Sequence, residues 1–381
     1  MIPYGRQSIS EADISAVVEV LQSDFLTQGP AVPAFEAAVG TKVGAAFSVA
    51  VNSATSGLHI ACLALDVGPG DQVWTSPNSF VASANCALYC GAEVDFVDID
   101  AQTLCMSELA LEEKLLRHSS LGLPMPKLVI PVHFGGQSCH MAEIARLANE
   151  YRFLVVEDAS HAIGASYLGR PVGDCRYSAA TVFSFHPVKI ITTGEGGLVT
   201  TNCPDLFARL SRFRTHGITR DPSQMRAAAP DAWYYEQLEL GLNYRMTDLQ
   251  AALGCSQLMR LDAFVARRQA LAAQYEKAFR GVTQTQKVPE YTSSARHLFP
   301  IRVPAGRRRH TFDRLRDCGI GVNVHYIPIY LHPYYEKLGF KAGLCPAAEA
   351  FYSEAISLPM YADLSDSQQS EVIEIIATMQ S

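Results

Sequence analysis

Several features that would place a protein in a specialised class are missing from this sequence. No apolar run approaches the roughly 18 residues that a membrane-spanning helix requires. The first residues also lack the charged and then apolar segments of a secretory signal. Basic residues are in deficit, with 31 Lys and Arg against 38 Asp and Glu, whereas nucleic-acid-binding proteins usually carry a basic stripe. We therefore expect a cytoplasmic protein that binds neither nucleic acid nor a membrane.

Closely spaced cysteine pairs are absent, and lysine is scarce. The ten cysteines are scattered and form no C-x-x-C pair. Zinc sites usually need tighter clusters, and disulfide frameworks are typical of short secreted chains. We therefore expect buried free thiols in a reducing compartment, and no metal site. Only eight Lys stand against 23 Arg, so a lysine in unusual surroundings is informative.

The residues that are present describe an ordinary folded protein. Of 381 residues, 48% are hydrophobic and 18% are charged, a balance typical of globular domains. A chain of this length usually forms about two domains. Ser10 is a good N-cap for a first helix. The apolar residues of that helix recur at helical spacing, at Ile14, Val17, Val18 and Leu21.

Short apolar runs alternate with helical patterns up to about residue 202. Such an alternation predicts an α/β fold with a mostly parallel sheet sandwiched by helices. Because the last two runs are joined by a link too short for a helical crossover, one of them should be antiparallel. The seven predicted strands are Ala46–Val51, Gln72–Thr75, Glu93–Asp98, Lys127–His133, Phe153–Glu157, Ala180–Phe185 and Gly197–Thr201.

The rest of the sequence is more varied. Residues 218–233 are polar and predict a mobile loop, and residues 247–280 predict one long helix or two. Further on, strand-like pieces such as Gly321–Tyr326 mix with helices. We therefore predict a large α/β domain over residues 1–250 and a smaller α+β domain over residues 251–381.

A lysine in apolar surroundings follows the sixth apolar run. Lys189 is flanked by Pro187-Val188 and by Ile190-Ile191. Such surroundings disfavour the ammonium form and lower the pKa of a lysine, which helps its amine to form a Schiff base with a carbonyl. The alternative is a lysine at a strand end whose amine simply reaches solvent.

Two carboxylates, Glu157 and Asp158, lie at the end of the fifth run. In open α/β sheets, ligands bind at the carboxyl ends of the strands. A carboxylate there needs a partner, because burying an unpaired charge is costly. Asp158 could pair with a protonated ring nitrogen, and a structural salt bridge is the alternative.

Hydroxyl residues open the helix that follows the first run, with Ser53, Thr55 and Ser56 in sequence order. Free N–H groups at a helix N-terminus suit a phosphate, although Ser and Thr are also ordinary N-caps. The sequence contains no P-loop, and no G-x-G-x-x-G follows a strand at the right place. Phe80, past the second run, could stack on an aromatic ring or belong to the core. Asn243 could reach a phosphate or stabilise its own loop.

Together, these pieces meet the needs of pyridoxal phosphate (PLP), which requires an amine, an acid for its ring nitrogen, a phosphate cup and a stacking residue. Three motifs carry a resemblance across nearly the whole chain: Phe183–Gly197, Glu157–Ala162 and Gly241–Asp248. They resemble the DegT/StrS-like sugar-nucleotide aminotransferases, which are fold-type-I PLP-dependent transferases. The resemblance implies that fold, the PLP cofactor and a homodimer with shared active sites.

The resemblance also implies roles for individual residues. Lys189 would bind the cofactor covalently and move protons, and Asp158 would pair with the ring nitrogen. Further cofactor contacts would come from Thr55, Ser56, Phe80, His161, Ser184 and Asn243, the last from the neighbouring subunit. Substrate contacts would come from Tyr4, Leu26, Thr27, Gln28, Gly29, His325 and Tyr326.

The N-terminal segments Ile2–Ile9 and Ser23–Pro30 resemble one branch more specifically, the transaminases of pseudaminic acid biosynthesis. That branch implies transfer of an amino group from glutamate to the C4 keto group of a UDP-linked 2-acetamido-2,6-dideoxy-hexos-4-ulose. Tyr330 departs from the histidine of many relatives, which leaves the choice of sugar open. The lysine at 189 argues against the related sugar dehydratases, which carry histidine there. Candidates for binding the UDP diphosphate are Arg220, Arg226 and Arg245.

Other functions compete with this one. A different nucleotide-linked keto-sugar could be aminated at C4 or C3. A cysteine desulfurase would need a reactive cysteine on a mobile loop, and the stretch 218–233 contains none. A PLP-fold protein without transaminase activity would bind the cofactor but transfer no amine.

Overall fold

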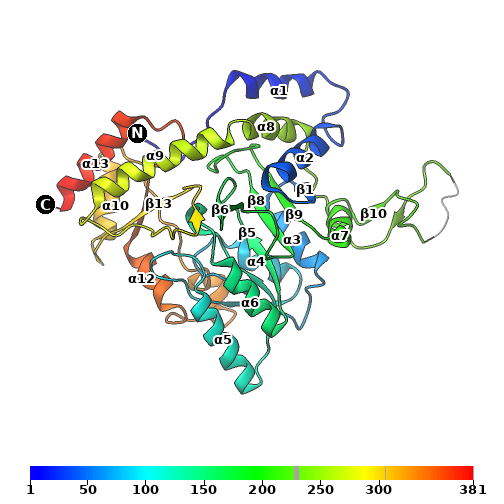
Figure 1. The fold of residues 1–381 in the computed structure, drawn as a ribbon, viewed down its shortest axis with the longest axis horizontal. Helices are drawn as coiled ribbons and strands as arrows, with labels where there is room; N and C mark the ends of the chain where they lie inside the picture. Colours follow the sequence, from blue (N-terminus) through cyan, green and yellow to red (C-terminus); the bar gives the residue numbers. More distant parts are fainter. Residues whose placement is uncertain (227–230, 305, 381) are drawn as a thin grey trace.

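The computed structural model describes residues 1–226, 231–304 and 306–380 (Figure 1). At its centre lies a seven-stranded sheet in the order β1-β9-β8-β5-β4-β2-β3, which confirms the predicted α/β fold class. Every strand of this sheet overlaps one of the predicted runs. The strands are β1 (Phe47–Val51), β2 (Gln72–Thr75), β3 (Glu93–Phe96), β4 (Pro126–Ile130), β5 (Leu154–Asp158), β8 (Ala180–Ser184) and β9 (Gly197–Thr201).

One strand of this sheet runs against the others. β9 pairs antiparallel with β8, where Ser184 lies opposite Gly197, and with β1, where Val51 also lies opposite Gly197. The other neighbouring pairs are parallel. The antiparallel strand expected from the short link is therefore β9. As a result, the start of β9 meets the carboxyl ends of β1 and β8 at one edge of the sheet.

The sheet separates two apolar cores, because successive side chains of a strand point to opposite faces. Val182 belongs to one core and its neighbour Phe183 to the other. The first core is covered by α3 (Ala54–Ala64), α4 (Ala82–Tyr89), α5 (Glu108–Leu121), α6 (Met141–Tyr151) and α7 (Pro204–Arg214). The second is covered by α2 (Ala31–Val43) and α8 (Asp248–Leu258).

The first helix, α1 (Glu11–Leu21), lies over α8 (Figure 1). Its N-cap is Ser10, as predicted, and Asp13 completes a capping box. The carboxylate of Asp13 is buried against α8, where it accepts a hydrogen bond from the Ser256 hydroxyl at 2.6 Å. Ile14 and Val18 are 48% and 40% exposed. The helix thus packs through a polar side chain and leaves part of its apolar stripe uncovered in the single chain.

The helix α9 (Leu261–Phe279) leads from the sheet to the C-terminal part of the fold (Figure 1). Residues 247–280 therefore hold two helices, α8 and α9. A third apolar core lies in the C-terminal part and includes Ile2, which forms a parallel bridge with Ile320. The division at residue 250 stays a prediction. The elements there are β13 (Phe299–Arg302), α10 (Arg308–Asp317), η2 (Ile329–Leu331), α11 (Pro333–Glu336), α12 (Pro346–Glu354), β14 (Ala355–Leu358) and α13 (Asp366–Gln380).

Small elements complete the chain. The 3-10 turn η1 (Phe134–Gly136) follows β4, and a three-stranded sheet joins β12 (Thr292–Ser293), β6 (Ser166–Tyr167) and β7 (Arg170–Pro171). Within the described residues, no helix combines the length and apolarity needed to cross a membrane.

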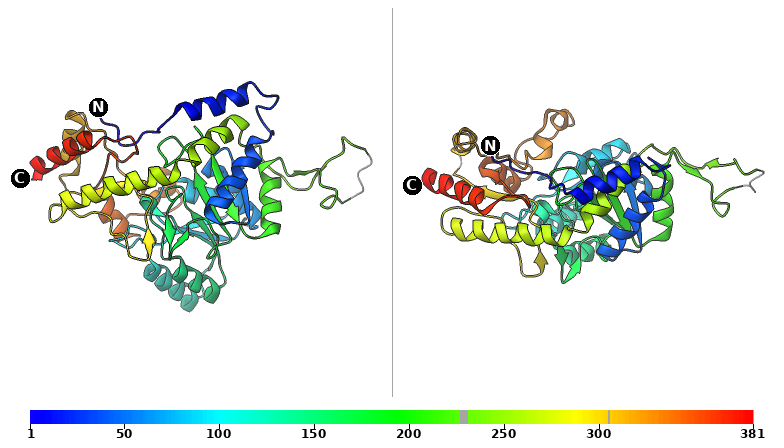
Figure 2. Two further views of the ribbon diagram at one scale, coloured as in Figure 1. Left: turned by 45° about the horizontal axis from the view of Figure 1, so that its top comes forward. Right: turned by 90° about the horizontal axis from the view of Figure 1, so that it is seen from above.

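Three predictions need correction. Gly321–Tyr326 is not a strand, since one isolated bridge links Asn323 to Ser357 and residues 323–326 border a cavity. The stretch 218–233 begins with a strand, because β10 (Ile218–Thr219) pairs with β11 (Glu236–Gln237) in a hairpin that projects from the body (Figure 2). Residues 227–230 of that stretch lie outside the described residues, and its mobility stays a prediction. All ten cysteines are free, but Cys203 and Cys318 are exposed rather than buried.

Candidate active site

A cavity of about 1180 Å³ opens at the carboxyl ends of β1, β5 and β8. Its floor comes from the loops that follow these strands, and one wall comes from residues 323–327 of the C-terminal part. Most of the predicted site residues border this one space, although they are spread over the whole sequence. They are Tyr4, Thr55, Ser56, Phe80, Asp158, His161, Ser184, Lys189, His325 and Tyr326.

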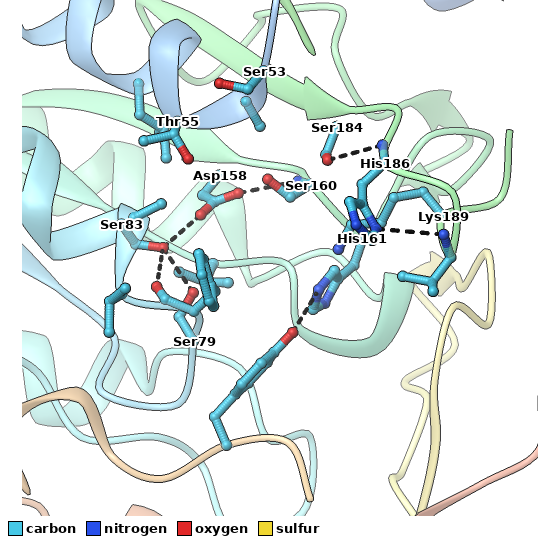
Figure 3. A pocket seen from close by; sticks show the side chains of 18 of the residues that line it. Ser53, Thr55, Ser79, Ser83, Asp158, Ser160, His161, Ser184, His186 and Lys189 are labelled. Atoms are coloured by element: carbon cyan, nitrogen blue, oxygen red, sulfur yellow. Dashed lines mark hydrogen bonds between the residues drawn. The ribbon is translucent and has the colours of Figure 1, made fainter. Parts of the chain in front are cut away.

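Lys189 lies in the turn between β8 and β9, where its backbone N–H donates to the carbonyl of His186 at 2.8 Å. Its side chain borders the cavity (Figure 3). Protein atoms surround the amine and remove much of its hydration, which lowers the pKa of Lys189 to about 8. The negative charge of Asp158 opposes this effect. The amine is therefore more often neutral near neutral pH than an ordinary lysine and can act as a nucleophile or a base.

Asp158 ends β5, and its carboxylate borders the cavity while remaining only 4% exposed. One oxygen, Oδ2, accepts a hydrogen bond from the Ser83 hydroxyl at 2.6 Å, and Oδ1 accepts one from the Ser160 N–H at 3.1 Å. These contacts fix the orientation of the carboxylate, whose two oxygens face Ser83 and Ser160 (Figure 3). Such an arrangement fits a protonated ring nitrogen. Sequence reasoning missed Ser83, whose position four residues after Ser79 was the available signal.

Glu157 points to the opposite face of β5, so the two neighbouring carboxylates differ in role. Its side chain accepts hydrogen bonds from His133 at 2.7 Å, Ser178 at 2.5 Å and Thr181 at 3.1 Å. Burial alone would raise the pKa of Glu157, but these donors outweigh it and the pKa is lowered. The structural role considered for this segment is therefore filled by Glu157, through hydrogen bonds, and not by Asp158.

The N-terminus of α3 faces the cavity with a group of hydroxyls. Ser53 is the N-cap and accepts the N–H of Ser56 at 3.1 Å, and the Ser56 hydroxyl donates to Asn52 at 2.6 Å. Thr55 and Ser184 border the same corner (Figure 3). Helix N–H groups with neighbouring hydroxyls form a cup for a phosphate. The donors that PLP needs for its phosphate are thus present.

Gly197 brings this cup close to the sheet. A Cβ atom added at this position would lie 2.5 Å from the backbone nitrogen of Ala54, in the first turn of α3. Real Cβ atoms do not approach a backbone so closely, so a glycine is required here. The start of α3 therefore rests directly on the start of β9.

Three neutral imidazoles border the same cavity as Lys189. Burial lowers the pKa of His161 and of His297 well below the ordinary value, and the charge of Lys189 adds to this effect. The same two causes lower the pKa of His325 to about 3. These rings add no positive charge near the lysine. Sequence reasoning missed His297, which lies 4.4 Å from the His161 ring, because its segment is distant from every motif.

The tautomer of His161 follows from its neighbours. Its Nδ1 accepts the N–H of Gly135 at 3.3 Å, so the proton resides on Nε2 and is donated to the Tyr326 hydroxyl at 3.2 Å. The hydroxyl proton of Tyr326 is then left for another acceptor. This tyrosine can therefore donate a hydrogen bond to a molecule bound in the cavity.

Phe80 lies at the cavity, whereas Tyr330 is buried away from it. Phe80 is 61% exposed and lies at the cavity, which rules out a core position and leaves its face available for a ring. Tyr330 is fully buried, donates to Glu349 and accepts the N–H of Cys345 at 3.0 Å. Tyr330 does not border the cavity, whereas His332, two residues later, does.

Some predicted site residues do not border the cavity in this chain. Residues 26–29 form a turn beside α8, where the carboxylate of Asp248 accepts the N–H of Gly29 at 2.8 Å. Asn243 is exposed on an extended segment that bridges to Thr215. The candidate diphosphate ligands Arg220, Arg226 and Arg245 are also absent from the described lining. Their contacts with cofactor or substrate stay predictions.

Comparison with known proteins supports the geometry. The DegT/DnrJ/EryC1/StrS aminotransferase family matches residues 7–377. A relative from Campylobacter jejuni, a UDP-4-amino-4,6-dideoxy-N-acetyl-beta-L-altrosamine transaminase, is 37% identical over 96% of this chain and 93% of its own. Helicobacter pylori PseC, an aminotransferase involved in the biosynthesis of pseudoaminic acid, superposes with a TM-score of 0.91 at 30% identity, covering 100% of this chain and 99% of that one. Spr1654 of Streptococcus pneumoniae, described as a sugar aminotransferase in its PMP form, matches with the same score, identity and coverage.

Proposed function

Since this chain belongs to the DegT/DnrJ/EryC1/StrS aminotransferase family, we propose that it aminates the C4 keto group of a UDP-linked 2-acetamido-2,6-dideoxy-hexos-4-ulose with glutamate as donor, in pseudaminic acid biosynthesis. The protein is a PLP-dependent sugar aminotransferase. The single observation that carries the proposed chemistry is that the Lys189 amine and the Asp158 carboxylate border one cavity, close enough for the carboxylate to act on the pKa of the amine. The sugar, the donor and the residue roles below are parts of the proposal.

Each residue of the site has a task in this reaction. PLP, when bound, supplies a conjugated ring that withdraws electrons from the carbon next to the transferred nitrogen. Lys189, with its pKa of about 8, accepts a proton from the α-carbon of glutamate and later gives one to the sugar carbon. Asp158 would keep the ring nitrogen of the bound cofactor protonated. The start of α3 would hold its phosphate, and Phe80 would cover one face of its ring.

The size of the cavity supports a large second substrate. Ligand cavities usually measure about 300–1,000 Å³, and this one measures about 1180 Å³. It therefore has room for a cofactor together with part of a nucleotide sugar. Tyr4, His325 and Tyr326 border the cavity and are the proposed sugar contacts. The names of the Campylobacter and Helicobacter relatives support the choice of sugar.

A homodimer with shared sites is also part of the proposal. Among the described residues that border the cavity, Lys189 is the one Lys or Arg, while the proposed ligands carry a phosphate, a diphosphate and carboxylates. Cationic groups of a partner chain are needed to balance these charges. Asn243, a neutral hydrogen-bond donor, lies exposed outside the cavity of its own chain and is available to a partner's site. The uncovered apolar stripe of α1 offers an interface. The unpaired cysteine pattern supports a cytoplasmic location for this dimer.

The test is a mass-spectrometric assay of the holoenzyme. Nitrogen-15-labelled glutamate is supplied with UDP-linked 4-keto sugars of both configurations, and the expected product is a UDP-linked amino sugar that carries the label. Lys189→Ala should yield no product, whereas Lys287→Ala, a change at an exposed lysine, should keep the full rate. Ordinary activity of Lys189→Ala would contradict the proposal, as would a holoenzyme that aminates no keto-sugar.

A second candidate is amination of another nucleotide-linked keto-sugar, at C4 or at C3. The observation in its favour is His332, which borders the cavity two residues after the departure from the family pattern at Tyr330. A different side chain at the cavity edge can change which hydroxyls of a sugar are bound. In the same assay, a labelled product from a 3-keto sugar alone would select this candidate.

A further inference from the structure

A chain of two hydroxyls leads to the carboxylate of Asp158. Ser83 Oγ lies 2.6 Å from Asp158 Oδ2, and Ser79 Oγ lies 2.7 Å from Ser83 Oγ. Both serines belong to the segment that enters α4, four residues apart, and both border the cavity (Figure 3). The carboxylate on β5 is thus tied to α4, whose first residue follows Phe80 by two positions.

The direction of this chain follows from the number of protons. A carboxylate can only accept, so the Ser83 hydroxyl donates its single proton to Asp158. The contact between Ser79 and Ser83 must then have Ser79 as the donor. Ser83 also lies 3.4 Å from the carbonyl of Phe80, a longer contact that cannot take the same proton. The two hydroxyls therefore form a directed relay that ends on Asp158 Oδ2.

Little of the surface of these three side chains is accessible to solvent. Ser83 is 0% exposed, Ser79 is 5% exposed and Asp158 is 4% exposed. Hydrogen bonds to a charged group are stronger than those between neutral groups, and a low-dielectric interior strengthens them further. Loss of the Ser83 hydroxyl would leave the buried carboxylate with one donor fewer. The Ser160 N–H, at 3.1 Å, would remain.

We propose that Ser83 is a positioning residue for transamination: with Ser79 behind it, its hydroxyl holds Asp158 as an oriented carboxylate that keeps the cofactor nitrogen protonated. The proposal rests on the pairing of Asp158 with that nitrogen, and it is independent of which sugar is aminated. It extends the site beyond the residues found from sequence. A purely structural Ser83 would tie α4 to β5 without affecting the ring.

The ring nitrogen itself reports the effect. Holoenzyme is reconstituted with PLP labelled with nitrogen-15 in the ring, and the nitrogen resonance is measured for the wild type and for Ser83→Ala. The wild type should show a protonated nitrogen. In Ser83→Ala, a less well stabilised carboxylate retains more of the proton, so the resonance should move toward the neutral ring. PLP binding should weaken by roughly tenfold.

Two further variants separate positioning from structure. Ser83→Thr keeps the hydroxyl and should restore the wild-type resonance, and Ser79→Ala should shift it in the same direction as Ser83→Ala but by less. A lowered melting temperature with an unchanged nitrogen resonance would assign Ser83 a structural role and overturn the proposal. If Ser83→Ala does not fold, the same nitrogen resonance is measured in Ser79→Ala. An unshifted resonance in Ser79→Ala then overturns the proposal.

The result is distinguishable from a failure of the proposed function. A wild-type resonance already at the neutral position would refute the pairing of Asp158 with the ring nitrogen, and this proposal with it. Failure of the tested keto-sugars to react would refute the choice of substrate and would leave the nitrogen measurements valid.

Discussion

Two opposing influences act on the amine of Lys189. Burial favours the neutral form, and the nearby carboxylate of Asp158 favours the charged form. Burial prevails, so the pKa falls to about 8 from the ordinary value of 10.5. The neutral amine is the form that attacks an aldehyde. The protonation of this one side chain should therefore control how fast the protein acquires its cofactor.

We expect the rate of covalent PLP attachment to the apoprotein to rise with pH, with a midpoint near 8. Stopped-flow absorbance of the lysine-bound cofactor measures this rate. Asp158→Asn removes the charge that raises the lysine pKa, so the midpoint should move to lower pH. Glu195→Gln changes a carboxylate that also borders the cavity and should leave the midpoint in place. A midpoint near 10.5 in the wild type would contradict the assignment.

At the scale of single residues, the sequence identified cavity residues where a reactive or polar side chain follows the carboxyl end of a predicted strand. Lys189, Asp158 and Thr55 each follow a predicted strand at its carboxyl end, and all three border the cavity. Ser83 and His297 were missed because the four-residue spacing of Ser79 and Ser83 is a weak signal and because no motif lies near His297 in the sequence. Their importance depends on a neighbour 75 residues away for Ser83 and on the fold of the C-terminal part for His297.

At the scale of elements, the close contact between β9 and α3 determines where the phosphate cup lies. Gly197→Ala would place a Cβ 2.5 Å from the backbone of Ala54, so β9 and α3 must move apart. We expect the free energy of unfolding to fall by about 1–3 kcal/mol and PLP binding to weaken. Gly68→Ala, where an added Cβ meets nothing within 4 Å, should change neither quantity. Thermal unfolding and PLP titration measure both effects.

An unchanged stability and PLP affinity in Gly197→Ala would show that the start of α3 adjusts without cost. The phosphate cup would then be positioned by Ser53, the N-cap of α3, rather than by the contact with β9.

Helix α1 has an apolar stripe that the single chain leaves partly uncovered. Ile14 is 48% exposed, and a second chain would bury it in the proposed dimer. Ile14→Glu places a charge in that interface, where burying it without a partner is costly. We expect the variant to shift from dimer to monomer in light scattering, with little change in secondary structure.

The matched control for α1 is Ala12→Glu. Position 12 lies about 200° around the helix from Ile14, since each residue advances a helix by about 100°. The same charge there should leave the dimer intact. A stable dimer in Ile14→Glu would show that the interface lies elsewhere.

At the scale of the whole molecule, the proposed dimer shares residues between its sites. Lys189→Ala and Asn243→Ala should each be inactive or severely impaired alone. If Asn243 serves the partner's site, a mixed dimer of the two variants contains one site with both residues intact. Random mixing should then restore about a quarter of the wild-type activity, because half of the dimers are mixed and each has one intact site of two.

The measurement is sugar amination after co-expression of the two variants. Recovered activity supports a shared site, since neither variant alone can supply it. No recovery, with mixed dimers present, would place Asn243 in the site of its own chain or outside the site altogether.

The sequence by itself determined the order of strands and helices along the chain and the chemistry of the cofactor site. Both are local, because apolar periodicity specifies an element and the strand ends carry the reactive side chains. Tertiary structure decided which of these ends meet and that Glu157 and Asp158 face opposite sides of β5. It also decided that Gly321–Tyr326 is not a strand and that its residues 323–326 form a cavity wall. It also brought Ser83 and His297 to the site. The physical reason is that burial and hydrogen-bond partners are set by residues distant in sequence, whereas periodicity and spacing are set by residues close in sequence.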